Sequence, residues 1–529
     1  MKVLKIPYQQ TGYFSKTVLD YLSEDKKIKP FYHLYSNLEN FRKQIELKEN
    51  FSKKKRKVLV DVLQKQYKNI DISNATARNI NLLQHSETFT ITTGHQLNLF
   101  TGPLYFLYKI FSAINLTEQL KEKYPNQNFV PIYWMATEDH DFDEINYFNF
   151  KNHKLQWQKK VKGAVGRLDT EGLEDVYTEF KKQLGKGKNA KYLADLFKKS
   201  YLEYSNLADA TRYLANELFK DYGLVILDAD EVTLKREFIP YIKEELLEQT
   251  AFKTISKTKG ALSKNYKIQV NPREINLFYL KDNLRERIVL QNGMYAVLNT
   301  EITFTQDEIL KEVDSFPERF SPNVIMRPLY QEVILPNLAY IGGGGELAYW
   351  LELKDYFSQN KIVFPILMLR NSVLLITEKE FIKLQKLGLT IPDLFLKQQQ
   401  LLNKKVKEIS NLNLDFSKQK VFLKEQFSHL REIASQTDVS FIGAVKAQEK
   451  KQLKGLENLE KRLLRAEKRK LKDIIARIII IQNKLFPNHS LQERQVNFAE
   501  YYLLYDAELF QILKENLKPL DTNFTIIVK

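Results

Sequence analysis

The chain has 529 residues, a formal net charge of +16 and no cysteine. Hydrophobic residues make up 43% and aromatic residues 12%, which is enough for a packed core and excludes wholesale disorder. The lack of cysteine excludes disulfides, iron–sulfur clusters, thiolate zinc sites and a cysteine nucleophile. At roughly 100–200 residues per domain, we expect two or three structural units.

The N-terminal part of the sequence indicates helices. Residues up to about 85 are rich in lysine, with apolar residues at helical spacing, and we interpret the basic run at 53–57 as helix surface. The first residues lack the apolar stretch of a secretory signal, and no apolar run approaches the ~20 residues of a membrane span. We therefore expect a soluble, cytoplasmic protein with no membrane partner.

Residues 89–135 carry the pattern of a βαβ unit. Residues 89–93 are β-branched and alternate, residues 104–124 have helical apolar spacing after Pro103, and residues 129–135 form a second apolar run. We expect these two strands to be parallel, with a right-handed crossover between them.

Further alternation of strands and helices follows the βαβ unit. We predict strands at 222–228, 323–327, 338–341 and 363–369, and a helix at 346–356 after the glycine run at 342–345. This alternation favours an α/β fold whose mostly parallel sheet is covered on both faces.

The C-terminal part reads as long helices. Three runs between residues 423 and 485 have heptad spacing with charges between the apolar positions, and a turn is expected within 437–443. Residues 446–472 hold 11 Lys or Arg against 4 Glu, a net charge of +7. We predict an antiparallel helical hairpin that forms a coiled coil. A hairpin that packs only on its own globular domain is the alternative.

We expect the chemistry at the carboxyl ends of the parallel strands, where ligands bind in open α/β sheets. Gly94, His95 and Gln96 follow one strand, and residues 138–144 (EDHDFDE) follow its parallel partner. Neighbouring strands lie about 4.8 Å apart, so the two segments can share one crevice. Acids at a helix start also stabilise its first turn, which is the structural alternative for residues 141–144.

A glycine-rich turn supplies the third element of the predicted site. Glycines at 342–345 allow a ligand to approach the backbone, and Arg327 offers a fork-shaped receptor for a carboxylate or phosphate. Neither GxGxxG nor GxxxxGK[ST] is present, so the motifs support neither a dinucleotide enzyme nor a Walker NTPase. We predict no resident metal, and no cofactor is specified.

The candidate residues fall into two groups. His140, an imidazole able to exchange protons near neutral pH, leads the catalytic candidates, which are His140, Asp139, Asp141 and His95. The candidates for substrate binding are Gly94, Gln96, Glu138, Arg327, Gly342, Gly343, Gly345, Glu346 and Tyr349.

Three segments carry a resemblance to a known family. They are TGHQLNLFTGPLYFLYKIFSAI, PIYWMATEDHDFDEIN and RPLYQEVILPNLAYIGGGGELAYWLEL, and in this order they resemble the bacillithiol-synthesis cysteine-adding enzymes over almost the whole chain. The family usually has Gln where this chain has His95, and Pro or Ala where it has Gly344.

The resemblance implies a fold and a reaction. It implies a Rossmann-like core with inserted connecting segments and a coiled coil that forms a homodimer. We expect residues 1–390 to form the core, 391–486 the helical hairpin, and 487–529 a segment that returns to the core. The implied reaction joins L-cysteine to glucosaminyl-malate in the last step of bacillithiol synthesis. Whether ATP or another nucleotide activates the carboxylate is left open.

Two other classes of function remain as alternatives. The EDHDFDE segment could serve a metal-dependent hydrolase, and the basic C-terminal helices could bind nucleic acid. The absence of aromatic residues at 446–472 disfavours binding of single strands, and we expect no nucleic-acid partner.

Overall fold

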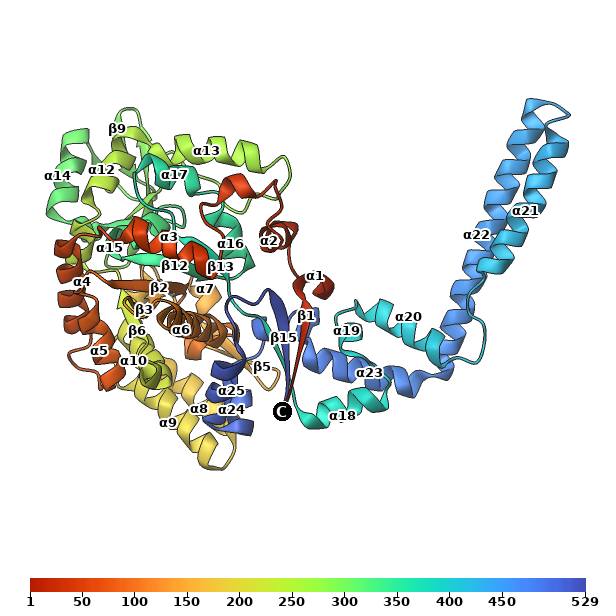
Figure 1. Ribbon diagram of the computed structural model, residues 1–529, viewed down its shortest axis with the longest axis horizontal. Helices are drawn as coiled ribbons and strands as arrows, with labels where there is room; N and C mark the ends of the chain where they lie inside the picture. Colours follow the sequence, from red (N-terminus) through yellow and green to blue (C-terminus); the bar gives the residue numbers. More distant parts are fainter.

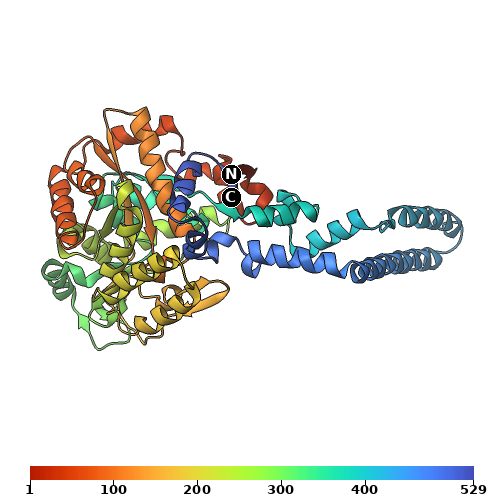
Figure 2. The ribbon, with the colours of Figure 1, turned by 90° about the horizontal axis from the view of Figure 1, so that it is seen from below.

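A computed structural model describes all residues, 1–529. The chain forms an α/β body from which a pair of long helices projects, as Figures 1 and 2 show. One apolar cluster of 122 buried residues runs from Ile6 to Val528, so both ends of the chain share the core of the body.

The centre of the body is a five-stranded parallel sheet in the order β13-β12-β2-β3-β6. Its strands are β2 (Thr88–His95), β3 (Asn128–Met135), β6 (Val225–Asp228), β12 (Asn337–Gly342) and β13 (Ile366–Leu369). In chain order this is the 3-2-1-4-5 arrangement of a Rossmann-like sheet, with its switch point between β2 and β12. The predicted α/β class and five of the six predicted strands are confirmed.

The predicted βαβ unit is also confirmed. Helix α6 (Tyr105–Lys123) connects β2 to the parallel strand β3 and begins two residues after Pro103. The helix is buried almost all round because it lies between the sheet and α25 (Glu508–Asn516), where Asn115 donates hydrogen bonds to the carbonyls of Lys514 and Leu517.

The N-terminal region contains helices, as predicted, and one strand that the sequence analysis missed. The helices include α2 (Lys16–Leu22), α3 (Leu38–Lys48), α4 (Lys53–Gln66) and α5 (Asn74–Leu82). The basic run lies on α4, but its Arg56 is 1% exposed and donates to the carbonyls of Leu83 and Thr88.

The missed strand belongs to a small sheet that joins the two ends of the chain. Strand β1 (Lys2–Pro7) pairs antiparallel with β15 (Asn523–Val528), which pairs parallel with β14 (Val373–Ile376). The pairing partners of β1 lie more than 500 residues away in the sequence, so local periodicity carries little information about it.

Two predicted elements differ from the structure. Residues 323–326 form a turn and not a strand, because the Asn323 side chain accepts hydrogen bonds from the backbone of Ile325 and Met326. Helix α15 (Arg327–Ile334) begins directly after this turn. The predicted helix at 346–356 is two helices, α16 (Gly344–Trp350) and α17 (Lys354–Gln359).

A second, antiparallel sheet was not predicted. Its order is β10-β9-β8-β7-β11, from β7 (Leu277–Lys281), β8 (Leu284–Gln291), β9 (Met294–Val297), β10 (Thr303–Phe304) and β11 (Phe320–Pro322). The β8–β9 turn contains Asn292 and Gly293, both with positive φ, which is a hairpin signal present in the sequence. This sheet covers the mouth of the site described below.

The C-terminal helical hairpin is confirmed. Helices α21 (Ser417–Ala434) and α22 (Val439–Lys470) form the projecting pair, here called the arm, and α23 (Lys472–Leu485) leads back to the body. The turn covers 435–438, slightly before the predicted position, because Asp438 caps α22 at Ser440 and Phe441. The third heptad run, on α23, packs into the main core through Ile478.

Candidate functional site

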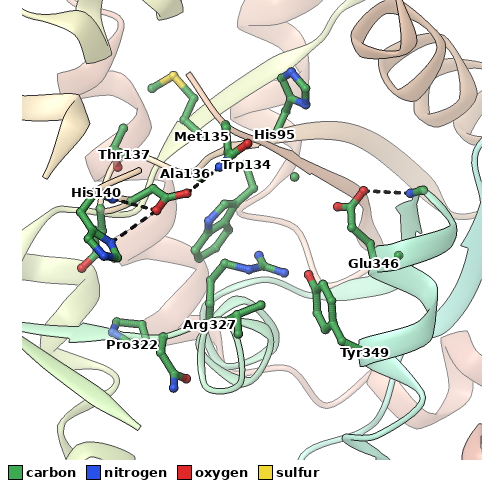
Figure 3. Close-up of a pocket in the computed structure, with 18 of the residues that line it drawn as sticks. His95, Trp134, Met135, Ala136, Thr137, His140, Pro322, Arg327, Glu346 and Tyr349 are labelled. Carbon is green, nitrogen blue, oxygen red and sulfur yellow. Dashed lines mark hydrogen bonds and ion pairs between the residues drawn. The ribbon is translucent and has the colours of Figure 1, made fainter. Parts of the chain in front are cut away.

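A cavity of about 710 Å³ lies at the carboxyl ends of β2, β3 and β12, at the switch point of the sheet. Most predicted site residues line it: Gly94, His95, Gln96, Glu138, Asp139, His140, Arg327, Gly343, Gly345, Glu346 and Tyr349. Asp141 is exposed and Gly342 is buried, and neither residue lines the cavity. Figure 3 shows Arg327, Trp134 and Tyr349 in its interior, with His140 and Glu346 on opposite sides.

The segments after β2 and β3 are in direct contact. Gln96 donates from Nε2 to Asp139 Oδ2 (2.9 Å) and to Glu144 Oε2 (2.8 Å). Burial alone raises the pKa of the Asp139 carboxyl, but hydrogen bonds from the His140 backbone N–H (2.7 Å) and from Gln96 help to outweigh it, so this pKa lies below its usual value. Asp139 is therefore held as a carboxylate.

His140 stands at the cavity mouth with its side chain about half exposed (51%). Its Nδ1 lies 2.6 Å from Nη1 of Arg285, on β8. A guanidinium can only donate, so Nδ1 must accept, and the neutral imidazole then carries its hydrogen on Nε2. In this state His140 presents an N–H donor and not a proton acceptor.

His95 is the last residue of β2 and is 7% exposed. Its ring packs against Tyr105 and Phe106, at centroid distances of 5.4 Å and 4.9 Å. Burial and the positive charges of Lys109 and Arg370 hold the pKa of His95 well below its usual value. His95 is therefore neutral, and Figure 3 shows its ring turned away from the cavity centre.

Gly94 and Gly342 are closely packed, whereas Gly343 and Gly345 of the glycine turn leave the backbone open to the cavity. A side chain at Gly94 would meet the Tyr340 hydroxyl at 2.9 Å, and one at Gly342 would meet Glu346 at 2.8 Å. Glu346 caps α16 by accepting from the Gly343 N–H (2.8 Å) and the Tyr340 hydroxyl (2.6 Å). Gly343 and Gly345 face the cavity, where a ligand can approach their backbone.

A buried lysine that the sequence analysis did not select joins this turn to β2. Lys109, on α6, is 3% exposed; its Nζ lies 2.6 Å from Glu346 Oε2 and donates to the Gly94 carbonyl (2.6 Å). The ion pair outweighs the effect of burial and lowers the pKa of Glu346. The available signal was a single lysine within the apolar run LYFLYKIFSAI.

Arg327 lies in an aromatic cage. Its guanidinium is 5.6 Å from the Trp134 ring, 5.4 Å from Tyr340 and 5.9 Å from Trp350. Nη1 donates to Gln331 (3.1 Å), whereas Nη2 has no partner in the protein. The residue begins helix α15 and does not end a strand as predicted, but it reaches the expected cavity. The cage fixes the guanidinium and leaves a donor for a ligand.

Arg370, directly after β13, is the second buried arginine of the cavity. It is 3% exposed and donates from Nη2 to Glu493 Oε1 (2.7 Å) and from Nη1 to the Asn371 carbonyl (3.0 Å). Its Nε has no partner and lies 3.8 Å from where a side chain at Gly343 would begin. One free N–H of Arg370 therefore faces the glycine turn.

The cavity as a whole is basic. Seven basic residues line it, namely Lys109, Arg273, Arg285, Arg287, Arg327, Arg370 and Arg494, against three acids, Glu138, Asp139 and Glu346. Of these seven, only Arg327 is among the predicted site residues. Arg285 and Arg287 come from the unpredicted antiparallel sheet, so local patterns gave no reason to place them here.

The acids of the EDHDFDE segment do not converge. Glu138 forms an ion pair with Lys235, which is 0% exposed, while Asp139 is engaged by Gln96. No group of three or more His, Cys, Asp or Glu side chains is arranged to hold a metal ion. The metal-dependent hydrolase alternative therefore lacks a ligand set.

Fold and site together define a Rossmann-like protein with a basic, small-molecule cleft at the switch point of its sheet. A family model described as "Bacillithiol biosynthesis BshC, N-terminal Rossmann-like domain" matches residues 1–371, and one described as "Bacillithiol biosynthesis BshC, C-terminal coiled-coil domain" matches residues 373–528. The chain belongs to the BshC family of bacillithiol biosynthesis.

Full-length relatives agree with this assignment. A Flavobacterium psychrophilum protein is 60% identical over 99% of this chain and 98% of its own length, and a Flavobacterium johnsoniae protein is 59% identical over 99% of both. A Christiangramia forsetii protein is 56% identical over 99% of this chain and 98% of its own length. Each bears the name "Putative cysteine ligase BshC".

A solved structure from Campylobacter jejuni, described as a "putative arginyl t-RNA synthetase", aligns over 88% of this chain and 98% of its own with 9% identity and a TM-score of only 0.22. None of the helices has the length and apolar character needed to cross a membrane.

Proposed function

We propose that this protein is the cysteine ligase of bacillithiol biosynthesis and joins L-cysteine to the amine of glucosaminyl-malate through an amide bond. The observation that carries the proposal is the basic cleft at the switch point, found in a chain that belongs to the BshC family. Glucosaminyl-malate brings two carboxylates and cysteine one, so the substrates match a cavity with seven basic residues and three acids.

Arg327 is the proposed anchor for a substrate carboxylate. Its guanidinium is held by aromatic rings and has a free Nη2, and the free Nε of Arg370 lies across the glycine turn. A fixed guanidinium loses little freedom when it binds a carboxylate, which favours tight and oriented binding. The same donors and the open backbone at Gly343 and Gly345 suit phosphate oxygens, should a nucleotide activate the acid.

Two features support amide formation in this cleft. The excess of positive charge disfavours an ammonium ion, so it favours the neutral, nucleophilic form of the acceptor amine. The Nε2–H of His140, fixed by Arg285, is suited to donate a hydrogen bond to the acyl oxygen as negative charge develops there. We therefore assign His140 as the catalytic donor. Glu138 and Glu346 form ion pairs with Lys235 and Lys109, so we assign Asp139, the remaining acid of the cavity, to hold the ammonium of cysteine against this excess of positive charge.

The remaining candidates receive supporting roles. Gln96 positions Asp139, and Glu346 positions the glycine turn through its hydrogen bond from Gly343. Glu138 is neutralised by Lys235 and serves to hold the β3 end. Asp141 is exposed, lies outside the cavity and makes no side-chain capping hydrogen bond at the start of the short helix α7 (Phe142–Ile145), so we assign it no catalytic role.

We also propose that the arm forms a homodimer. Its own buried cluster is small, comprising Phe427, Ala434 and Val445, whereas Leu459 and Phe422 are 52% and 62% exposed. Apolar side chains at heptad spacing on such a surface favour pairing with a second copy. The division of the chain into 1–390, 391–486 and 487–529 stays a prediction of the same kind.

The purified protein provides the test. Incubation with L-cysteine and glucosaminyl-malate, with and without ATP and Mg²⁺, should yield bacillithiol detectable by mass spectrometry after thiol labelling. L-Serine in place of cysteine and free malate in place of glucosaminyl-malate serve as controls. Product formed only with ATP would place the activation step on this protein. No amide product under any of these conditions would contradict the proposal.

A further inference from the structure

A second, much smaller cavity lies directly behind the cleft. Its volume is about 10 Å³, and it shares His95 and Gln96 with the cleft. The loop that follows β2 contributes Asn98 and Thr101, strand β3 contributes Tyr133, and helix α10 (Leu207–Phe219) contributes Thr211. This volume accommodates one water molecule, and its walls come from four segments that meet only in the folded protein.

Five polar side-chain atoms on the walls of this cavity have no hydrogen-bond partner in the protein. They are His95 Nε2, Asn98 Oδ1, Thr101 Oγ1, the Tyr133 hydroxyl oxygen and Thr211 Oγ1. All five residues are at most 7% exposed. None of these atoms contacts solvent. Buried polar atoms in folded proteins are almost always hydrogen-bonded, and five exceptions around one cavity indicate a shared ligand.

The chemistry of the walls identifies this ligand. His95 is neutral, so its Nε2 accepts a hydrogen bond when the ring hydrogen is on Nδ1, and Asn98 Oδ1 is an acceptor because Nδ2 donates to Glu144. The three hydroxyl groups can both donate and accept. A molecule that donates twice and also accepts satisfies this set, and water does so. The nearby charges of Lys109 and Arg370 disfavour a cation in the same place.

We propose that this cavity holds one internal water molecule, which donates to His95 and Asn98 and accepts from the surrounding hydroxyl groups, and that His95 acts through it as a positioning residue. The water holds the loop after β2 from behind. That loop needs such support because Phe100 and Thr101 adopt positive φ values of 46° and 68°, which are unfavourable for residues other than glycine.

The loop after β2 connects the water to the cleft through two hydrogen bonds. Gln96, next to His95, donates to Asp139, and Asn98 donates from Nδ2 to the Glu144 carbonyl (3.2 Å). The water therefore fixes the position of the residues that orient Asp139. The water itself is independent of the reaction, whereas the positioning role rests on the proposed function.

A high-resolution crystal structure of the full chain tests the ligand. The proposal expects one ordered water within hydrogen-bond distance of His95 Nε2 and at least two of the other four atoms. Density too strong for water at the same position, with anomalous signal in crystals grown with rubidium or caesium, would identify a cation and overturn it. A cavity that shows no density while its walls are well ordered would also overturn it.

Kinetics test the role of His95. His95→Gln keeps an acceptor for the water, so its activity and pH profile should stay close to those of the unchanged protein. His95→Leu removes the acceptor and should lower kcat by about tenfold or more, with a smaller change in KM, because displaced active-site groups slow reactions steeply. Thr211→Val should also lower kcat. Thr178→Val should have no effect, because the exposed Thr178 hydroxyl donates only to the Glu174 carbonyl within helix α8 (Leu173–Leu184).

The outcomes separate the two proposals. If His95→Gln were as inactive as His95→Leu, or lost one limb of the pH profile, His95 would be a proton carrier and the positioning role would be wrong. If His95→Leu were as active as the unchanged protein, the water would have no role in catalysis. Failure of the unchanged protein to form the amide would contradict the proposed function alone, because the crystal structure still decides the water.

Discussion

The cleft and the arm are both basic, but they hold their positive charge in different surroundings. The cleft buries Lys109 and Arg370 and keeps N–H donors of Arg327 and Arg370 free of protein partners. The basic residues of the arm are mostly exposed to solvent along α22. Solvated charges interact weakly with ligands, whereas buried and oriented donors interact strongly. The net charge of +7 on residues 446–472 is therefore weaker evidence for an anionic ligand than the single buried and oriented guanidinium of Arg327.

The sharpest test of this difference is the catalytic donor in the cleft. His140→Ala removes the N–H that Arg285 orients, so kcat should fall about 100- to 1,000-fold, as when an oxyanion donor is lost. Because His140 is half exposed, the free energy of unfolding in denaturant titrations should change by less than about 1 kcal/mol. His153→Ala, exposed on β5 (His153–Gln156), is the matched control. Full activity in His140→Ala would remove this residue from the mechanism.

The second test concerns the buried ion pair of the cleft. Lys109→Met leaves Glu346 without its counterion, and we expect a loss of about 3 kcal/mol in the free energy of unfolding, near the lower limit for broken buried pairs because Glu346 keeps some solvent contact. Lys123→Met, exposed on the same helix α6, should change it little. Equal stabilities of the two variants would mean that Lys109 is not a structural element of the site.

The third test compares arginines in the two regions. Arg327→Ala should weaken substrate binding at least tenfold, because a charge-assisted arginine contact contributes roughly 1.5–3 kcal/mol. Arg327→Lys should recover only part of this loss, since an ammonium lacks the fork. Arg462→Ala, on the exposed surface of the arm, should leave KM unchanged. Equal effects of Arg327→Ala and Arg462→Ala on KM would contradict the distinction between cleft and arm.

The fourth test addresses the arm alone. Light scattering at micromolar concentration should report about twice the mass of the chain, and Leu459→Asp combined with Leu463→Asp should reduce it to a monomer, because unpaired charges are costly at an apolar interface. Asn458→Asp, which adds a charge without removing an apolar side chain, should remain a dimer. If the unchanged protein is a monomer at all concentrations, the arm does not mediate assembly.

The parts of the fold that were predicted are those with strong local patterns. The β2–α6–β3 unit has clear periodicity, and the heptads of α21 and α22 also lie within single segments. The antiparallel sheet was missed because four of its five strands have five residues or fewer, and the longer β8 is rich in charged residues. Strand β1 was missed because its partner is at the other end of the chain.

The candidate site divides in the same way. Strand-end segments placed Gly94, Gln96, Asp139 and His140 in one cavity, since the ends of parallel strands meet at one edge of the sheet. The contact between His140 and Arg285 joins residues 145 positions apart, one in the loop after β3 and the other on β8 of the antiparallel sheet. Such contacts depend on the tertiary fold, and this one decides which ring nitrogen of the neutral imidazole carries the hydrogen.

The central claim is that this protein performs the cysteine-adding step. Metabolite profiling of a strain that lacks its gene, by mass spectrometry of labelled thiols and of their precursors, tests this claim most directly. We expect bacillithiol to disappear and glucosaminyl-malate to accumulate, and the unchanged gene, but not the Arg327→Ala form, to restore normal levels fully. Normal bacillithiol in the deletion strain would contradict the account, and loss of bacillithiol without accumulation of glucosaminyl-malate would place the protein at a different step.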